Sequence, residues 1–350
     1  MLMKRFFNRA LFFKEWKAVK WVSILLFIEI LYYKSMVIIE NIDYIKNIQK
    51  ISPNRDREEA LITLFNNDFI RNLDNFVLIL VVTMVFLAII LMKHERAAHE
   101  HMLVASMPFT RKEIIGTKWI SGALGVILPF AIHYILLNLI RVSNYSLIGS
   151  YMEFSTILKW LLLYLLAALS VFTFSLFVQT VMGGYIYGGI VGLILLYTPV
   201  GLSNLITFYL QVMGVSMKYL KNIYHIGNRM SVFSYISDYG WLDHKIIYHN
   251  FGLNTAILLV SIIVFLLLSF YTYRRNLLEN IGNLILFKPL EPFFKVGFSI
   301  CFALTAALII PRLIRIEIGV RSQLIALGIL NLIFGYFIVN KIIRITSKSA

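Results

Sequence analysis

The fold is decided by Phe76–Met92, which reads FVLILVVTMVFLAIILM. Apart from Thr83, every residue in this segment is apolar, and Lys93 opens a charged stretch directly after it. The length is close to the roughly 20 residues that a helix needs to cross a membrane. Similar apolar segments recur along the chain, so we expect eight spans. The expected spans are Trp21–Ile39, Phe76–Met92, Trp119–Ile140, Ile157–Val178, Gly183–Tyr209, Phe251–Tyr271, Phe298–Ile314 and Leu324–Asn340.

The composition supports an all-α integral membrane protein. Hydrophobic residues make up 59% of the 350 positions, charged residues make up 15%, and the mean hydropathy is +0.78. A soluble chain is about half apolar and a quarter charged, so the excess apolar surface must face lipid. No polar stretch is long enough for a second core, and we expect one transmembrane domain over residues 1–350. Pro199 in the fifth span favours a kink or an early end, and Pro311 in the seventh leaves a seven-span or re-entrant alternative open.

The basic residues predict the orientation of the chain. Segments 1–20, 93–118, 273–296 and 341–350 together hold 18 Lys and Arg residues against 6 Asp and Glu residues. Such an excess marks cytoplasmic segments, so both termini are expected inside the cell membrane of a multi-pass protein. Because the net charge of +15 is placed at helix ends, it does not indicate a nucleic-acid partner.

Two longer segments, 40–75 and 210–250, are then expected to be outer loops. The first leans acidic, and the second is rich in Tyr, Trp and Phe. Aromatic side chains of this kind are typical of the headgroup zone of a membrane. We interpret both segments as caps over the helix ends, with a substrate vestibule as the alternative.

The first cytoplasmic loop, 93–118, contains a predicted helical corner. Pro108 interrupts the helix that extends from the second span. Thr110 with Glu113 three residues later forms a capping box, which predicts a new helix that runs on into the third span. A stiff corner that is continuous with two spans can transmit a movement of a cytoplasmic partner to the membrane-spanning helices.

This corner resembles a known family. Residues 103–118 read LVASMPFTRKEIIGTK and are similar to the motif of ABC-2 type permeases, the membrane subunits of ABC exporters, here of a Gram-positive type. The resemblance implies that the corner is the coupling helix that contacts an ATPase. The basic and aromatic segment 9–17 is similar to the interfacial helix of that family, so residues 1–20 are expected to form an interfacial helix at the cytoplasmic surface. The residues expected to couple to the ATPase are Ser106, Pro108, Thr110, Arg111, Lys112, Glu113 and Lys118.

The resemblance implies a permease subunit that moves a substrate with energy from ATP hydrolysis. The sequence has no Gly-x-x-x-x-Gly-Lys-Ser/Thr loop, so ATP and Mg²⁺ are expected on separate cytoplasmic ATPase subunits. The chain itself is expected to be no enzyme and to bind no cofactor. It is expected to pair with a second permease chain, as a homodimer or a heterodimer, among membrane lipids. The family commonly has six spans, and the pair after Glu291 would be additional here.

Two alternatives come from other functional classes. One is a membrane sensor or immunity protein that binds a peptide or a lipid-linked compound without transport. The other is a membrane-embedded enzyme, which needs polar side chains that converge at one depth in the membrane. Neither alternative needs an ATPase partner.

Polar residues inside the spans are candidates for an intramembrane site. Glu29 lies in the middle of the first span, and a charge there is costly unless it is paired or faces a polar interior. Lys34 is five positions away, an awkward spacing for a pair on one helix. A partner on another span is therefore expected, with His133 and Asn138 as candidates. The alternatives are a structural pair and a substrate- or proton-linked site.

Two further patterns have mainly structural interpretations. Gly184, Gly188 and Gly192 recur every four residues and predict the close approach of another helix, from this chain or from a second subunit. The residues His94, Glu95, His99, Glu100 and His101 are capable of binding a metal, but they do not converge on one helix face. We expect a solvated helix surface there and no metal site.

Overall fold

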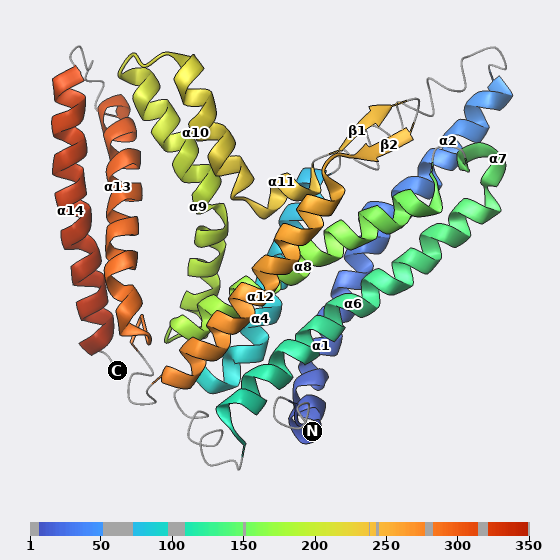
Figure 1. Cartoon of the computed structure of the whole chain (residues 1–350), viewed down its shortest axis with the longest axis horizontal. Helices are drawn as coiled ribbons and strands as arrows, with labels where there is room; N and C mark the ends of the chain where they lie inside the picture. Colours follow the sequence, from blue (N-terminus) through green and yellow to red (C-terminus); the bar gives the residue numbers. More distant parts are fainter. Residues whose placement is uncertain are drawn as a thin grey trace. The chain divides into compact units, whose positions relative to one another are not determined.

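The computed structural model is almost entirely helical (Figure 1), and it describes residues 7–51, 73–96, 109–149, 152–237, 239–242, 245–276, 283–313 and 321–348. This part of the chain contains eight helices that are long and apolar enough to cross a membrane. The protein is thus an all-α integral membrane protein, as the sequence predicts. Its elements are α1 (Arg9–Ile30), the π-helical turn η2 (Leu31–Met36), α2 (Val37–Ile51), α4 (Leu73–Arg96), α6 (Arg111–Ser143), α7 (Tyr145–Ile148), α8 (Phe154–Val181), α9 (Tyr185–Val212), α10 (Met217–Arg229), α11 (Val232–Ile236), β1 (Tyr239–Leu242), β2 (Lys245–Tyr248), α12 (Phe251–Arg275), the 3₁₀ turn η5 (Lys288–Leu290), α13 (Glu291–Leu313) and α14 (Arg321–Lys348).

The chain forms two compact units. The first consists of residues 1–91, 109–176 and 235–270, and the second consists of the remaining three segments. Helices α4, α8 and α12 each contribute residues to both units.

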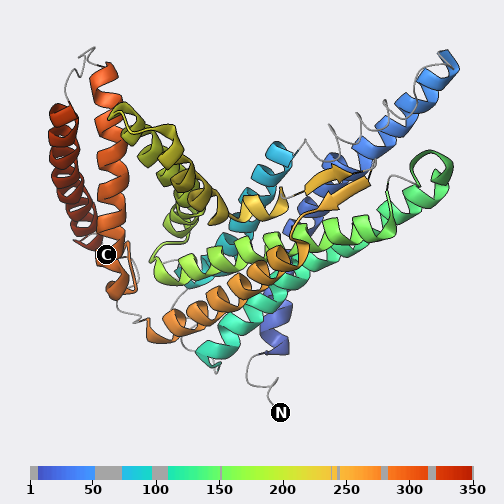
Figure 2. The same cartoon turned by 45° about the horizontal axis from the view of Figure 1, so that its top comes forward.

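In the first unit, α1 and α6 lie side by side, as both views show (Figures 1 and 2). Their close approach depends on a small residue, because a Cβ atom at Gly125 of α6 would lie 2.4 Å from Cγ1 of Val19 on α1. Gly122, one turn earlier, faces the ring of Phe172 on α8 in the same way. A larger residue at Gly125 would therefore push α6 away from α1, and one at Gly122 would push it away from α8.

The segment predicted to be an interfacial helix continues into the first span without a break. Helix α1 runs without interruption from Arg9 into the π-helical turn η2. Its buried positions continue at a helical spacing through Leu11, Glu15 and Val19, so this segment packs on the bundle along its whole described length. No Pro or Gly interrupts residues 9–30, which agrees with one continuous helix.

In the second unit, α9 and α10 form a tight antiparallel pair. Gly214, with φ of 81°, makes the turn between them, a backbone conformation that glycine adopts without strain. A Cβ atom at Gly227 of α10 would lie 2.0 Å from Oγ of Ser203 and 2.8 Å from the carbonyl oxygen of Pro199 on α9. Helix α9 continues past Pro199 to Val212, so the expected early end does not occur.

The predicted outer loop 210–250 contains more regular structure than the sequence indicates. Besides α10 and α11 it includes an antiparallel hairpin in which Tyr239 pairs with Tyr248 and Trp241 pairs with Ile246. The predicted loop 40–75 likewise begins as helix, because α2 extends to Ile51.

Candidate functional site

The predicted capping box at the start of α6 is present. The backbone N–H of Glu113 donates to Oγ1 of Thr110 over 3.3 Å, and the backbone N–H of Thr110 donates to Oε2 of Glu113 over 2.8 Å. This reciprocal pair satisfies two of the otherwise unpaired donors at the helix start. Thr110 is exposed, while Arg111, Lys112 and Glu113 are half-buried. The other two residues predicted at this corner, Ser106 and Pro108, lie outside the described residues.

Replacing Thr110 with Ala is expected to lower the free energy of unfolding by about 1 kcal/mol, because the cap loses its acceptor. Thr110→Ser keeps the hydroxyl and serves as the control, with a stability close to that of the wild type. The measurement is thermal unfolding of the purified protein in detergent. Equal melting temperatures for the Ala and Ser variants would contradict a capping role.

Lys118, another residue of the predicted coupling corner, is buried. Its side chain is only 2% exposed, and Nζ donates to Oε1 of Glu15 over 2.8 Å and also to the carbonyl oxygen of Leu91. The ammonium group therefore joins α6 to α1 and α4 inside the first unit. This residue, which is predicted to couple to the ATPase, thus faces the bundle, where burial beside a carboxylate accommodates its charge.

Further hydrogen bonds fix the start of α6. The backbone N–H of Asn8 donates to Oγ1 of Thr117 over 3.0 Å, while Oδ1 of Asn8 caps α1 by accepting from Ala10 N–H over 2.9 Å. The indole N–H of Trp119 donates to Oγ1 of Thr173 on α8 over 3.0 Å. The first two turns of α6 are thus attached to the start of α1 and to α8.

Sequence reasoning missed Asn8, Glu15 and Thr117 as parts of this joint. Glu15 carried the one available signal, since it is the single acidic residue among the six basic residues of the segment 1–20. Glu15 also lies four residues from Leu11 and four from Val19, on the apolar side of the helix. A single carboxylate at such a position is typical of a buried residue that pairs with a cation.

Glu29 does have its partner on another span, as expected. Oε1 accepts a hydrogen bond of 2.6 Å from the hydroxyl of Thr83 on α4. The candidates His133 and Asn138 instead bond to their own helix: Nδ1 of His133 lies 2.9 Å from the carbonyl oxygen of Pro129, and the amide of Asn138 donates to the carbonyl oxygen of Tyr134. Among the described residues, the three candidates do not form one hydrogen-bonded site.

Each of these three side chains keeps one buried polar atom without a hydrogen-bond partner among the described residues. The atoms are Oε2 of Glu29, Nε2 of His133 and Oδ1 of Asn138. A buried polar atom of this kind is costly unless water reaches it, so these positions favour internal hydration in the first unit.

Lys34 lies in the π-helical turn and is fully buried. Its Nζ is 5.3 Å from the ring centroid of Phe76 and 5.7 Å from that of Tyr164. The quadrupoles of the two rings attract the cation, which helps to hold it inside the span. Turns of this kind are frequent at functional sites.

Two of the three predicted packing glycines, Gly188 and Gly192, face the preceding helix α8. A Cβ atom at Gly188 would lie 2.6 Å from Oε1 of Gln179 on α8, whereas Gly192 has an ordinary distance of 4.0 Å to Cγ1 of Val178. At Gly184 the nearest side chain is Tyr187 of the same helix. At Gly188 the close neighbour is thus another helix of the same chain.

The histidine- and glutamate-rich segment is described only at its start. Glu95 is 6% exposed, and its Oε2 accepts a hydrogen bond of 2.5 Å from the hydroxyl of Tyr273. Glu95 therefore belongs to the interior of the second unit and not to the solvated surface that we expected. His99, Glu100 and His101 lie outside the described residues. The part of the chain that the structure describes holds no group of three His, Cys, Asp or Glu residues placed to bind a metal.

No protein-family model matches the chain, and no curated protein or solved structure matches it either. Function is therefore inferred from the residues and contacts of the chain itself.

Proposed function

We propose that this chain is the membrane-spanning permease subunit of an ABC transporter, and that separate cytoplasmic ATPase subunits drive it. The observation that carries the proposal is the joint at the start of α6, where a capped helix end is attached to three other spans. Its half-buried charged residues, Arg111, Lys112 and Glu113, are the surface that a partner would contact. The resemblance of residues 103–118 to ABC-2 type permeases supports the same assignment.

Force applied at this helix start has a direct route into the bundle. The route begins at the cap formed by Thr110 and Glu113 and passes along two turns of α6 to Lys118. From there the ion pair with Glu15 and the bond to the Leu91 carbonyl lead into α1 and α4. Helices are stiff along their axes, so a tilt of α6 at its start moves three spans together.

The rest of the proposal follows from this role. ATP and Mg²⁺ are bound by the partner, and this chain acts as the transport component and carries out no catalysis. It works as a pair of permease chains among lipids, with both termini and the start of α6 on the cytoplasmic side. Export or extrusion of a substrate from the bilayer is the proposed direction.

Photo-crosslinking tests the contact. A photoreactive amino acid is placed at Lys112 in the tagged chain, which is expressed in the organism that encodes it. The control carries the same group at Leu139, which is 60% exposed near the far end of α6. We expect a crosslink from position 112 to a protein with an ATP-binding Gly-x-x-x-x-Gly-Lys-Ser/Thr loop, and none from position 139.

A charge reversal gives an independent readout. Lys112→Glu is expected to reduce the co-purifying ATPase activity at least about fivefold, since it inverts a charge at the contact. Lys159→Glu reverses an equally basic but exposed residue near the start of α8 and is expected to change nothing. If no ATPase co-purifies with either the wild type or the control in several mild detergents, the permease assignment fails. A membrane sensor or a membrane-embedded enzyme is then the better functional assignment.

A further inference from the structure

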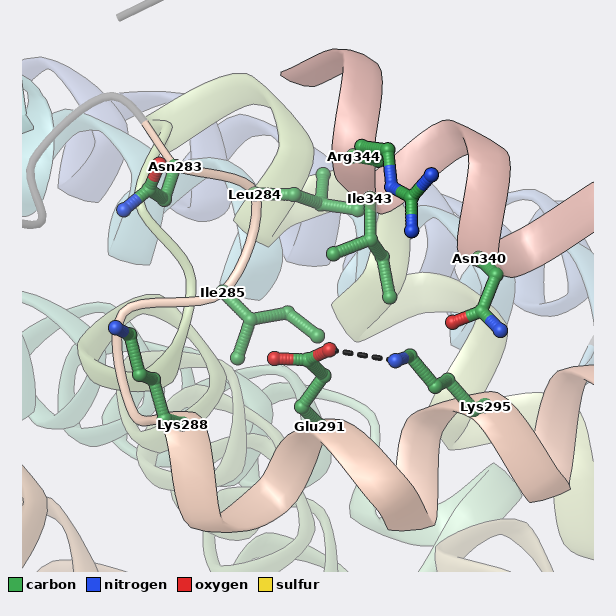
Figure 3. A pocket seen from close by; sticks show the side chains of 9 residues that line it. All are labelled: Asn283, Leu284, Ile285, Lys288, Glu291, Lys295, Asn340, Ile343 and Arg344. Carbon is green, nitrogen blue, oxygen red and sulfur yellow. Dashed lines mark ion pairs between the residues drawn. The ribbon is translucent and has the colours of Figure 1, made fainter. Parts of the chain in front are cut away.

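A pocket with a basic lining lies within the second unit, at the start of α13 and the end of α14 (Figure 3). Its volume is about 540 Å³, which lies within the range of pockets that bind small ligands. The lining residues are Asn283, Leu284, Ile285, Lys288, Glu291, Lys295, Asn340, Ile343 and Arg344. All of them belong to the described residues of one unit, so their mutual arrangement is defined.

Two contacts shape the walls of this pocket. Helices α13 and α14 pack against each other, and a Cβ atom at Gly335 of α14 would lie 2.9 Å from Cδ1 of Phe302 on α13. The third wall is the segment before η5, which is fixed to the end of α8 by a hydrogen bond of 2.8 Å from Leu286 N–H to the carbonyl oxygen of Val181. The pocket is therefore built from anchored backbone on three sides.

The lining carries more positive than negative charge. Lys288, Lys295 and Arg344 contribute three cations, and Glu291 is the single carboxylate among the nine lining residues. Glu291 already forms an ion pair with Lys295, in which its Oε1 lies 2.7 Å from Nζ (Figure 3). Among the nine lining residues the cations thus outnumber the carboxylate by three to one, which favours an anion as the ligand.

The polar groups also include the kinds of donor that bind a phosphate group. Figure 3 shows Glu291 and Lys295 of α13 on the side of the pocket opposite Asn340 and Arg344 of α14. Arginine offers a planar fork of N–H donors, lysine offers a compact charge, and an amide adds a neutral donor. This mixture of donors is typical of sites that hold tetrahedral oxyanions.

The location of the pocket places it at a membrane boundary. Lys288 opens the apolar helix 288–309, and Arg344 lies one residue before the end of the apolar helix 322–345. Leu284, Ile285 and Ile343 give the same pocket an apolar wall. Basic pockets between spanning helices at the cytoplasmic surface bind the head groups of anionic lipids, and this end of the chain is predicted to be cytoplasmic.

We propose that this pocket is a binding site for a phosphate-bearing anion, held by Lys288, Lys295 and Arg344. The phosphate belongs either to the head group of an acidic phospholipid or to a soluble phosphate ester. The proposal does not depend on the transport function, because it rests on the pocket alone.

Lipid binding to the purified full-length chain tests this proposal. The probes are phosphatidylglycerol, the zwitterionic phosphatidylcholine, and glycerol 3-phosphate as the soluble ester, each titrated and detected by native mass spectrometry. The pocket variant is Lys288→Gln with Arg344→Gln. The charge-matched control is Arg274→Gln with Lys341→Gln, two exposed basic residues of the same unit that do not line the pocket.

The wild type and the control are expected to bind phosphatidylglycerol at least about tenfold more tightly than the pocket variant, since charge-assisted hydrogen bonds are lost. Phosphatidylcholine is expected to show no such difference. If glycerol 3-phosphate displaces the lipid or binds in its place with the same dependence on the pocket, the site is a phosphate site for a soluble ligand. Equal losses in the pocket and control variants would overturn the proposal, because general attraction to basic helix ends would then explain the binding. Absence of any anion preference in the wild type would overturn it as well.

Discussion

Lys118→Met is expected to lower the melting temperature of the purified protein by about 10 °C. The substitution leaves the Glu15 carboxylate, whose side chain is 6% exposed, inside the bundle without the ammonium group that lies 2.8 Å away in the wild type. It also removes the donor to the Leu91 carbonyl. Loss of one partner from a buried ion pair typically costs about 3–5 kcal/mol, because the remaining charge is uncompensated.

The double variant Glu15→Leu with Lys118→Met separates the ion pair from general packing at this position. Replacement of both charges by apolar side chains of similar size is often close to neutral, so most of the lost stability is expected to return. Lys17→Met, an exposed lysine on α1, is the control and should change the melting temperature by at most about 2 °C. Scanning fluorimetry in detergent gives the values. A melting temperature of Lys118→Met equal to that of the wild type would sink the idea that this pair holds the helices together.

Gly183→Ala is expected to have the second large effect. A Cβ atom at this position would lie 1.7 Å from the carbonyl oxygen of Asn283, which is backbone and has no rotamer to change. The Gly183 N–H donates to the carbonyl oxygen of Leu284 over 3.1 Å. The new methyl group would therefore push away the same backbone segment, at Asn283 and Leu284, that this hydrogen bond holds in place. We expect a loss of about 3 kcal/mol and a melting temperature lower by about 5–10 °C.

This substitution also tests the basic pocket, since Asn283, Leu284 and Ile285 form one of its walls. Binding of phosphatidylglycerol is expected to weaken together with the melting temperature. The matched control is Gly201→Ala in α9, where a Cβ atom meets nothing within 4 Å. That control is expected to be neutral or slightly stabilising, because Ala favours a helix interior over Gly. A stable Gly183→Ala protein with unchanged lipid binding would contradict the described contact.

The features that the sequence predicted are those encoded locally. The eight spans follow from apolar length alone, and the start of α6 follows from Thr110 and Glu113, which are only three residues apart. The charges that organise the interior are separated much further. Glu15 and Lys118 are 103 positions apart, and each looks like an ordinary surface charge in its own segment.

The candidate intramembrane site shows the same limit. A partner for Glu29 on another span was predictable from the cost of its charge, but the identity of that partner was not. Thr83 stands in an apolar run and has no charge to mark it, although its hydroxyl is the group that donates to Glu29. His133 and Asn138 attracted attention as polar residues, yet each finds an acceptor one turn earlier in its own helix.

The π-helical turn η2 has a consequence for the length of the first span. Buried residues recur every four positions through Val22, Leu26, Ile30, Lys34 and Ile38. In a regular α-helix a step of four residues rotates the side-chain direction by about 40° more than one full turn. Positions spaced by four residues therefore drift gradually away from one face of the helix. A π-helical turn takes up one residue more than an α-helical turn, which returns the later positions to the buried side. The extra residue within Leu31–Met36 is therefore what keeps Lys34 and Ile38 on the same buried side as Leu26 and Ile30.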